Sequence, residues 1–135
     1  MKYGYFDNDN REYVITNPEL PVKWINYVGN LNFGGFVDHT GGSLICKGDP
    51  ATNRIVKYIP QLPDSDFKGE TLYIRIKENG KYIIFSPFFV PTLHNWELYE
   101  CHVGLGYTKI ISKLYGIRVE VTIFVPDGSD RVIRD

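Results

Sequence analysis

The sequence has almost no net charge, since its 135 residues carry a formal charge of −1 at pH 7. The basic residues are scattered along the chain and form no block. Such a chain sets up no overall field that would attract nucleic acid or an anionic membrane surface. We therefore expect neither of them as a partner.

Long hydrophobic runs are also missing. The N-terminal segment Met1–Asp7 contains no apolar run of signal-peptide length. Nothing in the chain approaches the roughly 20 apolar residues that a helix needs to cross a bilayer. We expect a soluble, cytoplasmic protein.

Cysteine is scarce. Cys46 and Cys101 lie far apart in the sequence and form no Cys-x-x-Cys pattern. A disulfide between them stays open on sequence grounds, but two buried thiols in a reducing compartment fit the pattern better.

Motifs that mark common cofactor, metal and catalytic sites are absent. The chain has no Gly-x-x-x-x-Gly-Lys-Ser/Thr phosphate loop, and His39, His94 and His102 lack metal-ligand spacing. The segment Asp7–Asp9 resembles the start of a calcium loop but lacks the later glycine and glutamate. Cys101 and His102 are adjacent, and neighbours in a strand point to opposite faces, so a buried thiol beside a hydrogen-bonded histidine is the better interpretation. We expect no metal, no cofactor and no catalytic residue.

The chain is rich in strand signals and has almost no helix signals. Hydrophobic residues make up 43% and charged residues 23%, which is the balance of a globular domain. The predicted strands are residues 2–6, 12–16, 24–28, 33–37, 43–47, 54–59, 71–77, 81–85, 106–113 and 117–125. Asn79-Gly80 is the strongest hairpin signal, and residues 60–69 form a predicted loop rich in proline and aspartate. Short strands separated by turn residues indicate an all-β fold, here an antiparallel β-sandwich.

The length allows one domain at most, with roughly 68–70% of the unfolded surface buried. Residues 130–135 look like a strand that has only just begun. We therefore expect residues 1–135 to be the first part of a larger sandwich domain.

Aromatic residues make up 15% of the chain. A sugar ring can stack on such side chains, but core packing and oligomer interfaces also favour large aromatics. Composition leaves these three interpretations open.

A set of short motifs runs in order along the chain. They are Tyr3–Asp7, Arg11–Thr16, Trp24–Tyr27 with Gly29, Thr40–Gly42, Tyr99–Cys101, Gly104–Thr108, and Gly116-Ile117 with Val121–Pro126. In composition and spacing these motifs resemble the N-terminal, supersandwich-like domain of the inverting glycoside phosphorylases that act on cellobiose, laminaribiose and chitobiose.

The resemblance implies a large cytoplasmic enzyme with a β-sandwich domain, a helical linker and an (α/α)₆ catalytic barrel, the last two absent from this chain. Such an enzyme cleaves a β-linked gluco-disaccharide with inorganic phosphate and releases α-glucose 1-phosphate. Phosphate is already an anionic nucleophile, so one catalytic acid suffices where an inverting hydrolase needs two carboxylates. That acid belongs to the barrel, so no residue here is assigned a catalytic role.

The resemblance also implies a role for this domain in forming a homodimer and in lining the acceptor site. Our candidate sugar-binding residues are the loop residues His39, Thr40, Gly41, Gly42 and Ser43. The competing interpretation is a turn that needs positive φ at Gly41 or Gly42. After the glycine pair, cellobiose-type members carry an aromatic, serine and aromatic run where this chain has Ser43–Cys46, which favours laminaribiose over cellobiose.

Two alternatives come from other functional classes. A stand-alone, non-catalytic carbohydrate-binding β-sandwich would bind oligosaccharides on exposed aromatics. A structural interaction module would bind no small ligand at all.

Overall fold

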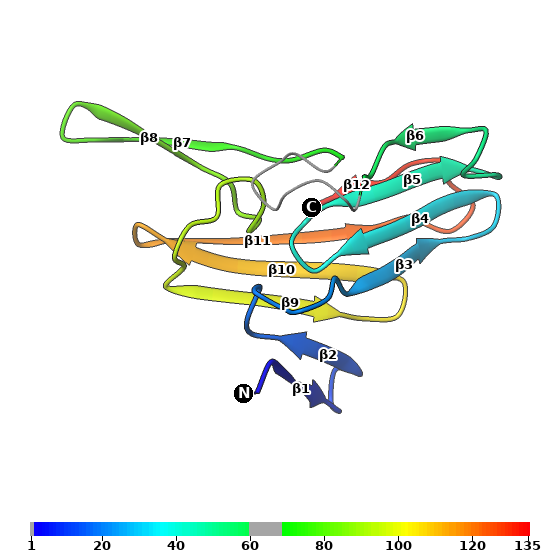
Figure 1. Ribbon diagram of the computed structural model, residues 1–135, viewed down its shortest axis with the longest axis horizontal. Helices are drawn as coiled ribbons and strands as arrows, with labels where there is room; N and C mark the ends of the chain where they lie inside the picture. Colours follow the sequence, from blue (N-terminus) through cyan, green and yellow to red (C-terminus); the bar gives the residue numbers. More distant parts are fainter. Residues whose placement is uncertain (1, 60–68) are drawn as a thin grey trace.

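The computed structural model describes residues 2–59 and 69–135, which form twelve strands in three antiparallel sheets and, within these residues, no helix. Figure 1 shows the two larger sheets and a separate hairpin. The predicted all-β antiparallel sandwich is confirmed. Most of the predicted loop at 60–69 lies outside the described residues.

The larger sheet has six strands in the order β1-β2-β9-β10-β11-β12. The bounds are β1 Gly4–Asp7, β2 Glu12–Ile15, β9 Leu98–Val103, β10 Tyr107–Leu114, β11 Ile117–Phe124 and β12 Ile133–Arg134. Strands β10 and β11 pair over their whole length and are joined by Tyr115 and Gly116, whose φ angles are 52° and 72°. Positive φ at both central residues is the geometry of the tight hairpin turn that matches strand twist.

The second sheet has four strands in the order β3-β4-β5-β6. The bounds are β3 Ile25–Gly29, β4 Phe33–Asp38, β5 Ser43–Lys47 and β6 Arg54–Val56. Strand β3 packs against β10 and β11, which sets this sheet over the larger one.

The core lies between these two sheets. Both contribute buried apolar side chains, and so does the connection that follows β8. The six-stranded sheet supplies Ile15, Cys101, Ile110, Val121 and Ile123, the four-stranded sheet supplies Val28, Phe33, Val37 and Ile45, and the connection supplies Phe88, Phe89 and Val90. Alternate residues of each strand thus face a shared interior, as in other sandwiches.

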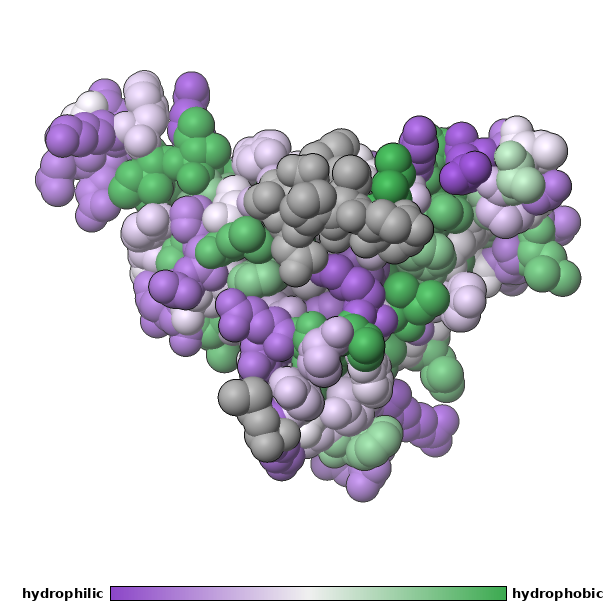
Figure 2. Space-filling model, in the orientation of Figure 1, coloured by the Kyte–Doolittle hydropathy of each residue, from purple (hydrophilic) through white to green (hydrophobic). Residues whose placement is uncertain are grey.

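The third sheet is the hairpin of β7 (Ile74–Glu78) and β8 (Lys81–Phe85). Its turn is the predicted Asn79-Gly80 pair, with φ angles of 48° and 79°. The hairpin projects from the body at the upper left of Figures 1 and 2, where hydrophobic residues are exposed. Tyr82 and Ile84 expose 60% and 56% of their surface there.

The sequence analysis missed one strand, β9, which lies at the centre of the larger sheet between β2 and β10. Cys101 and His102 are adjacent in β9 and are both buried, at 0% and 9% exposure. Burial of two consecutive residues breaks the alternation of buried and exposed positions that marks a half-buried strand, so the sequence pattern gave little signal.

Candidate functional site

All five residues proposed from the sequence to bind sugar lie at the turn from β4 to β5, with Ser43 as the first residue of β5. We refer to residues 38–43 as the His39 loop. His39, Thr40, Gly41, Gly42 and Ser43 are all buried, and His39 and Thr40 expose 2% and 1% of their surface. A sugar contact made by this loop stays a prediction.

Asp38 organises the His39 loop. Its Oδ1 accepts hydrogen bonds from the Thr40 amide and hydroxyl, both at 2.8 Å, and from the Gly42 amide at 3.0 Å. Its Oδ2 accepts a hydrogen bond from the Tyr58 hydroxyl at 2.8 Å. A buried carboxylate with four such bonds is satisfied in place and fixes the turn.

Gly41 has a φ of 95°, so the turn interpretation holds at this position. A Cβ at Gly41 would lie 2.4 Å from Cγ of Phe88. The loop is therefore pressed against the Phe88 ring from the connection after β8.

His39 joins the loop to two other segments. Its Nδ1 accepts from the Trp24 amide at 3.2 Å, so its Nε2 carries the proton and donates to the Pro18 carbonyl at 2.9 Å. The His39 carbonyl accepts from the Tyr99 hydroxyl at 2.8 Å. Burial lowers the pKa of the imidazole, which keeps this ring neutral.

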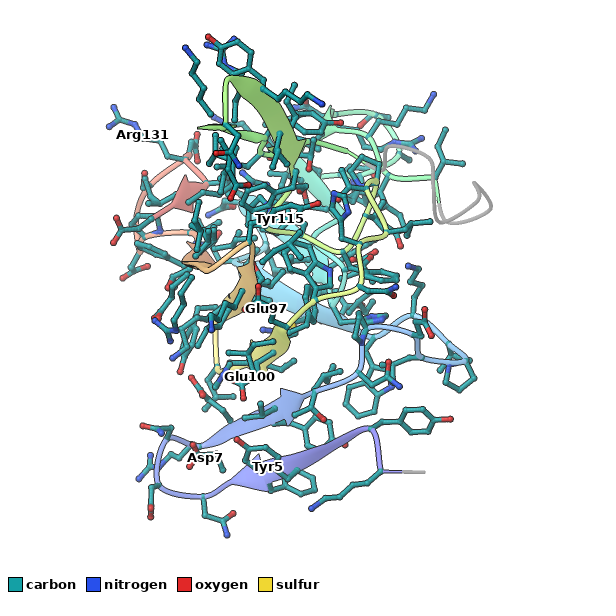
Figure 3. The ribbon with its side chains drawn as sticks, turned by 90° about the vertical axis from the view of Figure 1, so that its left-hand side faces the viewer. Tyr5, Asp7, Glu97, Glu100, Tyr115 and Arg131 are labelled. Carbon is teal, nitrogen blue, oxygen red and sulfur yellow. The ribbon has the colours of Figure 1, made fainter. Side chains whose placement is uncertain are left out.

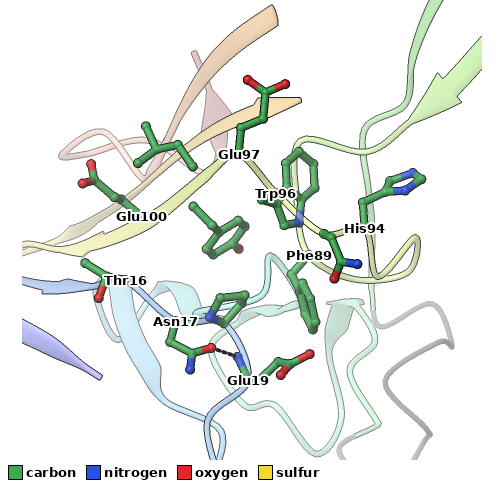
Figure 4. A pocket seen from close by; sticks show the side chains of 12 residues that line it. Thr16, Asn17, Glu19, Phe89, His94, Trp96, Glu97 and Glu100 are labelled. Carbon is green, nitrogen blue, oxygen red and sulfur yellow. Dashed lines mark hydrogen bonds between the residues drawn. The ribbon is translucent and has the colours of Figure 1, made fainter. Parts of the chain in front are cut away.

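Pro18 and Tyr99 both line a groove of about 380 Å³ on the other side of these bonds. Its walls are the β2–β3 connection at 16–19 and the segment 94–100 that leads into β9, with Phe89 also lining it. Figure 4 shows Trp96 above the groove and Asn17, Glu19 and Phe89 below it. The His39 loop thus supports the groove from behind, and we keep the name "the groove" for this site.

Trp96 sits in an aromatic cluster that fixes its ring. The ring centroids of Phe85, Tyr99 and His94 lie 6.4, 5.9 and 6.1 Å from it. Two ring nitrogens in this cluster, Nε1 of Trp96 and Nε2 of His94, are buried without a hydrogen-bond partner among the described residues. Buried polar atoms without a partner are rare in native proteins.

Three glutamates line the groove, and two of them have partners. Glu97 pairs with Lys113 at 3.2 Å and accepts from the Gly116 amide, and these hydrogen bonds lower its pKa. Glu100 lies 3.3 Å from Nε2 of His102. In Figure 4, Glu97 and Glu100 point away from the space between Trp96 and Glu19, and both residues are also labelled in Figure 3. The Glu19 carboxylate has no partner among the described residues, so it gives the groove its negative charge.

A second polar cluster ties three strands of the larger sheet together. We refer to Glu12, His102, Tyr107 and Lys109 as the Glu12 cluster. Glu12 accepts from His102 Nδ1 at 2.6 Å and from the Tyr107 hydroxyl at 2.5 Å, and Lys109 lies 3.6 Å away. Burial raises the pKa of Glu12, but these hydrogen bonds and charges outweigh it, so the pKa falls below its usual value.

The Tyr107 hydroxyl, which donates to that carboxylate, has its pKa raised to about 12. The polar groups of the cluster are therefore satisfied by one another.

The Cys101–His102 pair is as interpreted from the sequence, with the thiol fully buried and the imidazole bonded to carboxylates. Burial raises the pKa of Cys101, which removes it as a nucleophile. Both cysteines are free and buried, as predicted. Within the described residues, no group of three or more His, Cys, Asp or Glu could hold a metal ion, and no helix is long and apolar enough to span a membrane.

Sequence reasoning did not find the groove. Trp96 was one of many aromatic residues, and Asn17-Pro18 indicated only an interruption of regular secondary structure. Glu19 belonged to no recognisable motif. Because the groove forms where residues about 80 positions apart meet, only the paired register of β2 with β9 brings them together.

Comparison with known proteins finds a matching domain family and several longer relatives. The family model described as "Glycosyl hydrolase 94, supersandwich domain" matches residues 11–135. The chain is 39% identical, over its full length, to an N,N′-diacetylchitobiose phosphorylase from Vibrio furnissii. It is 33% identical, over 97% of its length, to a 3-O-β-D-glucopyranosyl-β-D-glucuronide phosphorylase from Paenibacillus borealis.

These relatives are far longer than the chain. The matched region is 17% of the Vibrio furnissii protein and 16% of the Paenibacillus borealis protein. The chain therefore corresponds to one part of each relative.

Proposed function

This chain belongs to the family of glycosyl hydrolase 94 supersandwich domains, and we propose that it serves as that domain of an inverting glycoside phosphorylase. The reaction breaks a β-glycosidic bond of a gluco-disaccharide. Inorganic phosphate attacks the anomeric carbon, α-glucose 1-phosphate forms, and the leaving sugar oxygen takes a proton. The observation that carries this proposal is the match over 11–135, joined with relatives that are themselves named phosphorylases.

The role proposed for the domain is structural, dimer-forming and acceptor-site lining, with the catalytic acid supplied by another part of the protein. The buried groups support a structural role. Asp38 is fully hydrogen-bonded, Glu12 is bonded to His102 and Tyr107, and the Cys101 thiol is shut off from solvent.

A second copy of the protein, or the rest of the same protein, is the proposed partner. The projecting β7–β8 hairpin supports this because a two-stranded hairpin is marginal alone in water. Burial of the apolar side chains exposed on the hairpin, such as Ile84, against a partner surface would be favourable. We place the protein in the cytoplasm, in line with its two free cysteines.

Laminaribiose is the proposed substrate, with cellobiose next. One relative is named for a 3-O-β-D-glucopyranosyl compound, which supports a 3-linked substrate. A second candidate is N,N′-diacetylchitobiose, because the two relatives named for it share 39% identity with this chain, against 33% for the glucuronide enzyme.

The test compares phosphate-dependent release of sugar 1-phosphate from laminaribiose, cellobiose and N,N′-diacetylchitobiose by the protein that contains this chain. We expect laminaribiose to give the highest kcat/KM. A higher kcat/KM for N,N′-diacetylchitobiose would identify the second candidate as the substrate. Saccharide binding without any phosphorolysis would favour the alternative, a non-catalytic carbohydrate-binding module.

A further inference from the structure

The groove has the chemistry of a small-molecule binding site. Its volume of about 380 Å³ falls in the lower part of the range of small-molecule sites, about 300–1,000 Å³. It joins an aromatic ring, an amide and a carboxylate that has no partner among the described residues, on two segments that the β2–β9 pairing holds side by side.

The aromatic side of the groove is rigid. Trp96 is packed against Phe85, Tyr99 and His94, so its ring is held in place before any ligand arrives. A fixed indole presents a flat apolar face to a ligand, while its Nε1 is buried without a hydrogen-bond partner among the described residues. The C–H face of a sugar ring matches such an apolar surface.

The polar side of the groove offers both kinds of hydrogen-bonding group. The Asn17 Oδ1 accepts from the Glu19 amide at 2.9 Å, which fixes the Asn17 side chain and leaves its NH₂ group as a donor. Glu19 is an acceptor with no partner among the described residues. A hydroxyl group can donate to the carboxylate and accept from the amide at once.

The charge of the groove selects against anions. Glu97 pairs with Lys113 and Glu100 lies beside His102, whereas the Glu19 carboxylate has no partner among the described residues. None of the described residues that line the groove is a lysine or an arginine. A phosphate or carboxylate on the ligand would meet a like charge.

From these features we propose that the groove binds a neutral saccharide, which lies against Trp96 and is held by Asn17 and Glu19. His39 is a positioning residue for this site, because it bonds to Pro18 on one wall and to Tyr99 on the other. The inference deepens the proposed function and rests on it, since it names where on this domain the sugar is held.

The test is an NMR titration of the ¹⁵N-labelled 135-residue chain, which contains two tryptophans and therefore two indole N–H signals. Trp24 is the internal control, since it stacks on Tyr13 and does not line the groove. The variant W24F assigns the two signals. With laminaribiose we expect the Trp96 signal to shift in a saturable way while the Trp24 signal stays in place.

Matched ligands and variants sharpen the test. The compound 3-O-β-D-glucopyranosyl-β-D-glucuronide carries a carboxylate where laminaribiose is neutral, and we expect it to bind about tenfold more weakly or worse. N17A should weaken laminaribiose binding about fivefold to tenfold, since it removes the amide donor to a ligand hydroxyl. E19Q should weaken binding by a similar factor, since it replaces a charged acceptor with a neutral one. E120Q is the control, because Glu120 pairs with Arg118 and does not line the groove.

The proposal is overturned if the Trp96 signal does not move, if E19Q and N17A bind laminaribiose as the wild type does, or if the glucuronide binds as tightly. If the longer protein carries out phosphorolysis but the Trp96 signal does not shift in the titration, the saccharide site in the groove is refuted and the proposed function is not. Saturable saccharide binding without phosphorolysis would support the proposed site in the groove and refute the proposed phosphorylase function.

Discussion

At the residue scale, His39 sits where three segments meet. It contacts the β2–β3 connection through Pro18, the start of β3 through Trp24, and β9 through Tyr99. These three hydrogen bonds use Nε2, Nδ1 and the carbonyl oxygen of His39, respectively. Protonation of Nδ1 would turn its acceptor into a donor that faces the Trp24 amide.

The pH dependence of stability follows from this geometry. Burial lowers the pKa of His39 in the folded chain below its usual value of 6.5. Below that value the unfolded chain binds more protons than the folded chain, so the free energy of unfolding falls as pH decreases from about 6.5. Each unit of lowering is equivalent to about 1.4 kcal/mol.

The measurement is urea unfolding between pH 7.5 and pH 5, compared with the variant H39Q. We expect the wild type to lose stability over this range. The variant should be less stable at pH 7.5 and show a flatter profile. Parallel profiles for the two proteins would refute the assignment to His39.

Gly41 gives a second prediction at this scale. Gly41→Ala places a methyl group at positive φ and 2.4 Å from the Phe88 ring. We expect a loss of about 2–4 kcal/mol, since backbone strain and overpacking both contribute. The control is Gly128→Ala, where φ is 68° and a Cβ has open space, so about 1 kcal/mol is expected. Thermal unfolding compares the two, and equal losses would contradict the role of the Phe88 contact.

At the scale of the elements, the Glu12 cluster joins β2, β9 and β10. Tyr107→Phe removes the hydroxyl that donates to the buried Glu12 carboxylate. A hydrogen bond to a charged group contributes about 1.5–3 kcal/mol, so a loss of that size is expected. Tyr82→Phe is the control because Tyr82 lies on the exposed hairpin, and a change within about 0.5 kcal/mol is expected there. Chemical denaturation that shows no difference between the two variants would argue against the cluster.

The elements also show which parts of the fold the sequence predicts. Hairpins are local, so Asn79-Gly80 was enough to place the β7–β8 turn. Strand β9 was missed because its consecutive residues Cys101 and His102 are both buried and its pairing with β2 joins residues about 90 positions apart.

The site follows the same rule. The turn at Gly41 was predictable from a glycine pair, and its positive φ agrees with that interpretation. The groove was not predictable, because Glu19 and Trp96 are brought together only by the long-range pairing of the sheet. Burial of His39 and Thr40 likewise depends on Phe88 and Tyr99, which lie far away in the sequence.

At the scale of the whole molecule, the chain is a sandwich that matches 17% of the length of its Vibrio furnissii relative. Two of its surfaces expose large apolar side chains of the kind that protein interfaces cover. The β7–β8 hairpin exposes Tyr82 and Ile84, and the face of the four-stranded sheet exposes Tyr27 at 73%. If the proposed function holds, we expect both surfaces to be covered by a second copy or by the rest of the protein.

The central claim is that this domain acts within a phosphorylase and supplies no catalytic group. The most direct measurement follows laminaribiose turnover by ³¹P NMR, on the 135-residue chain and on the longer protein that contains it, with and without inorganic phosphate. We predict α-glucose 1-phosphate from the longer protein only, and only when phosphate is present. Free glucose formed without phosphate, or turnover by the 135-residue chain alone, would contradict the account.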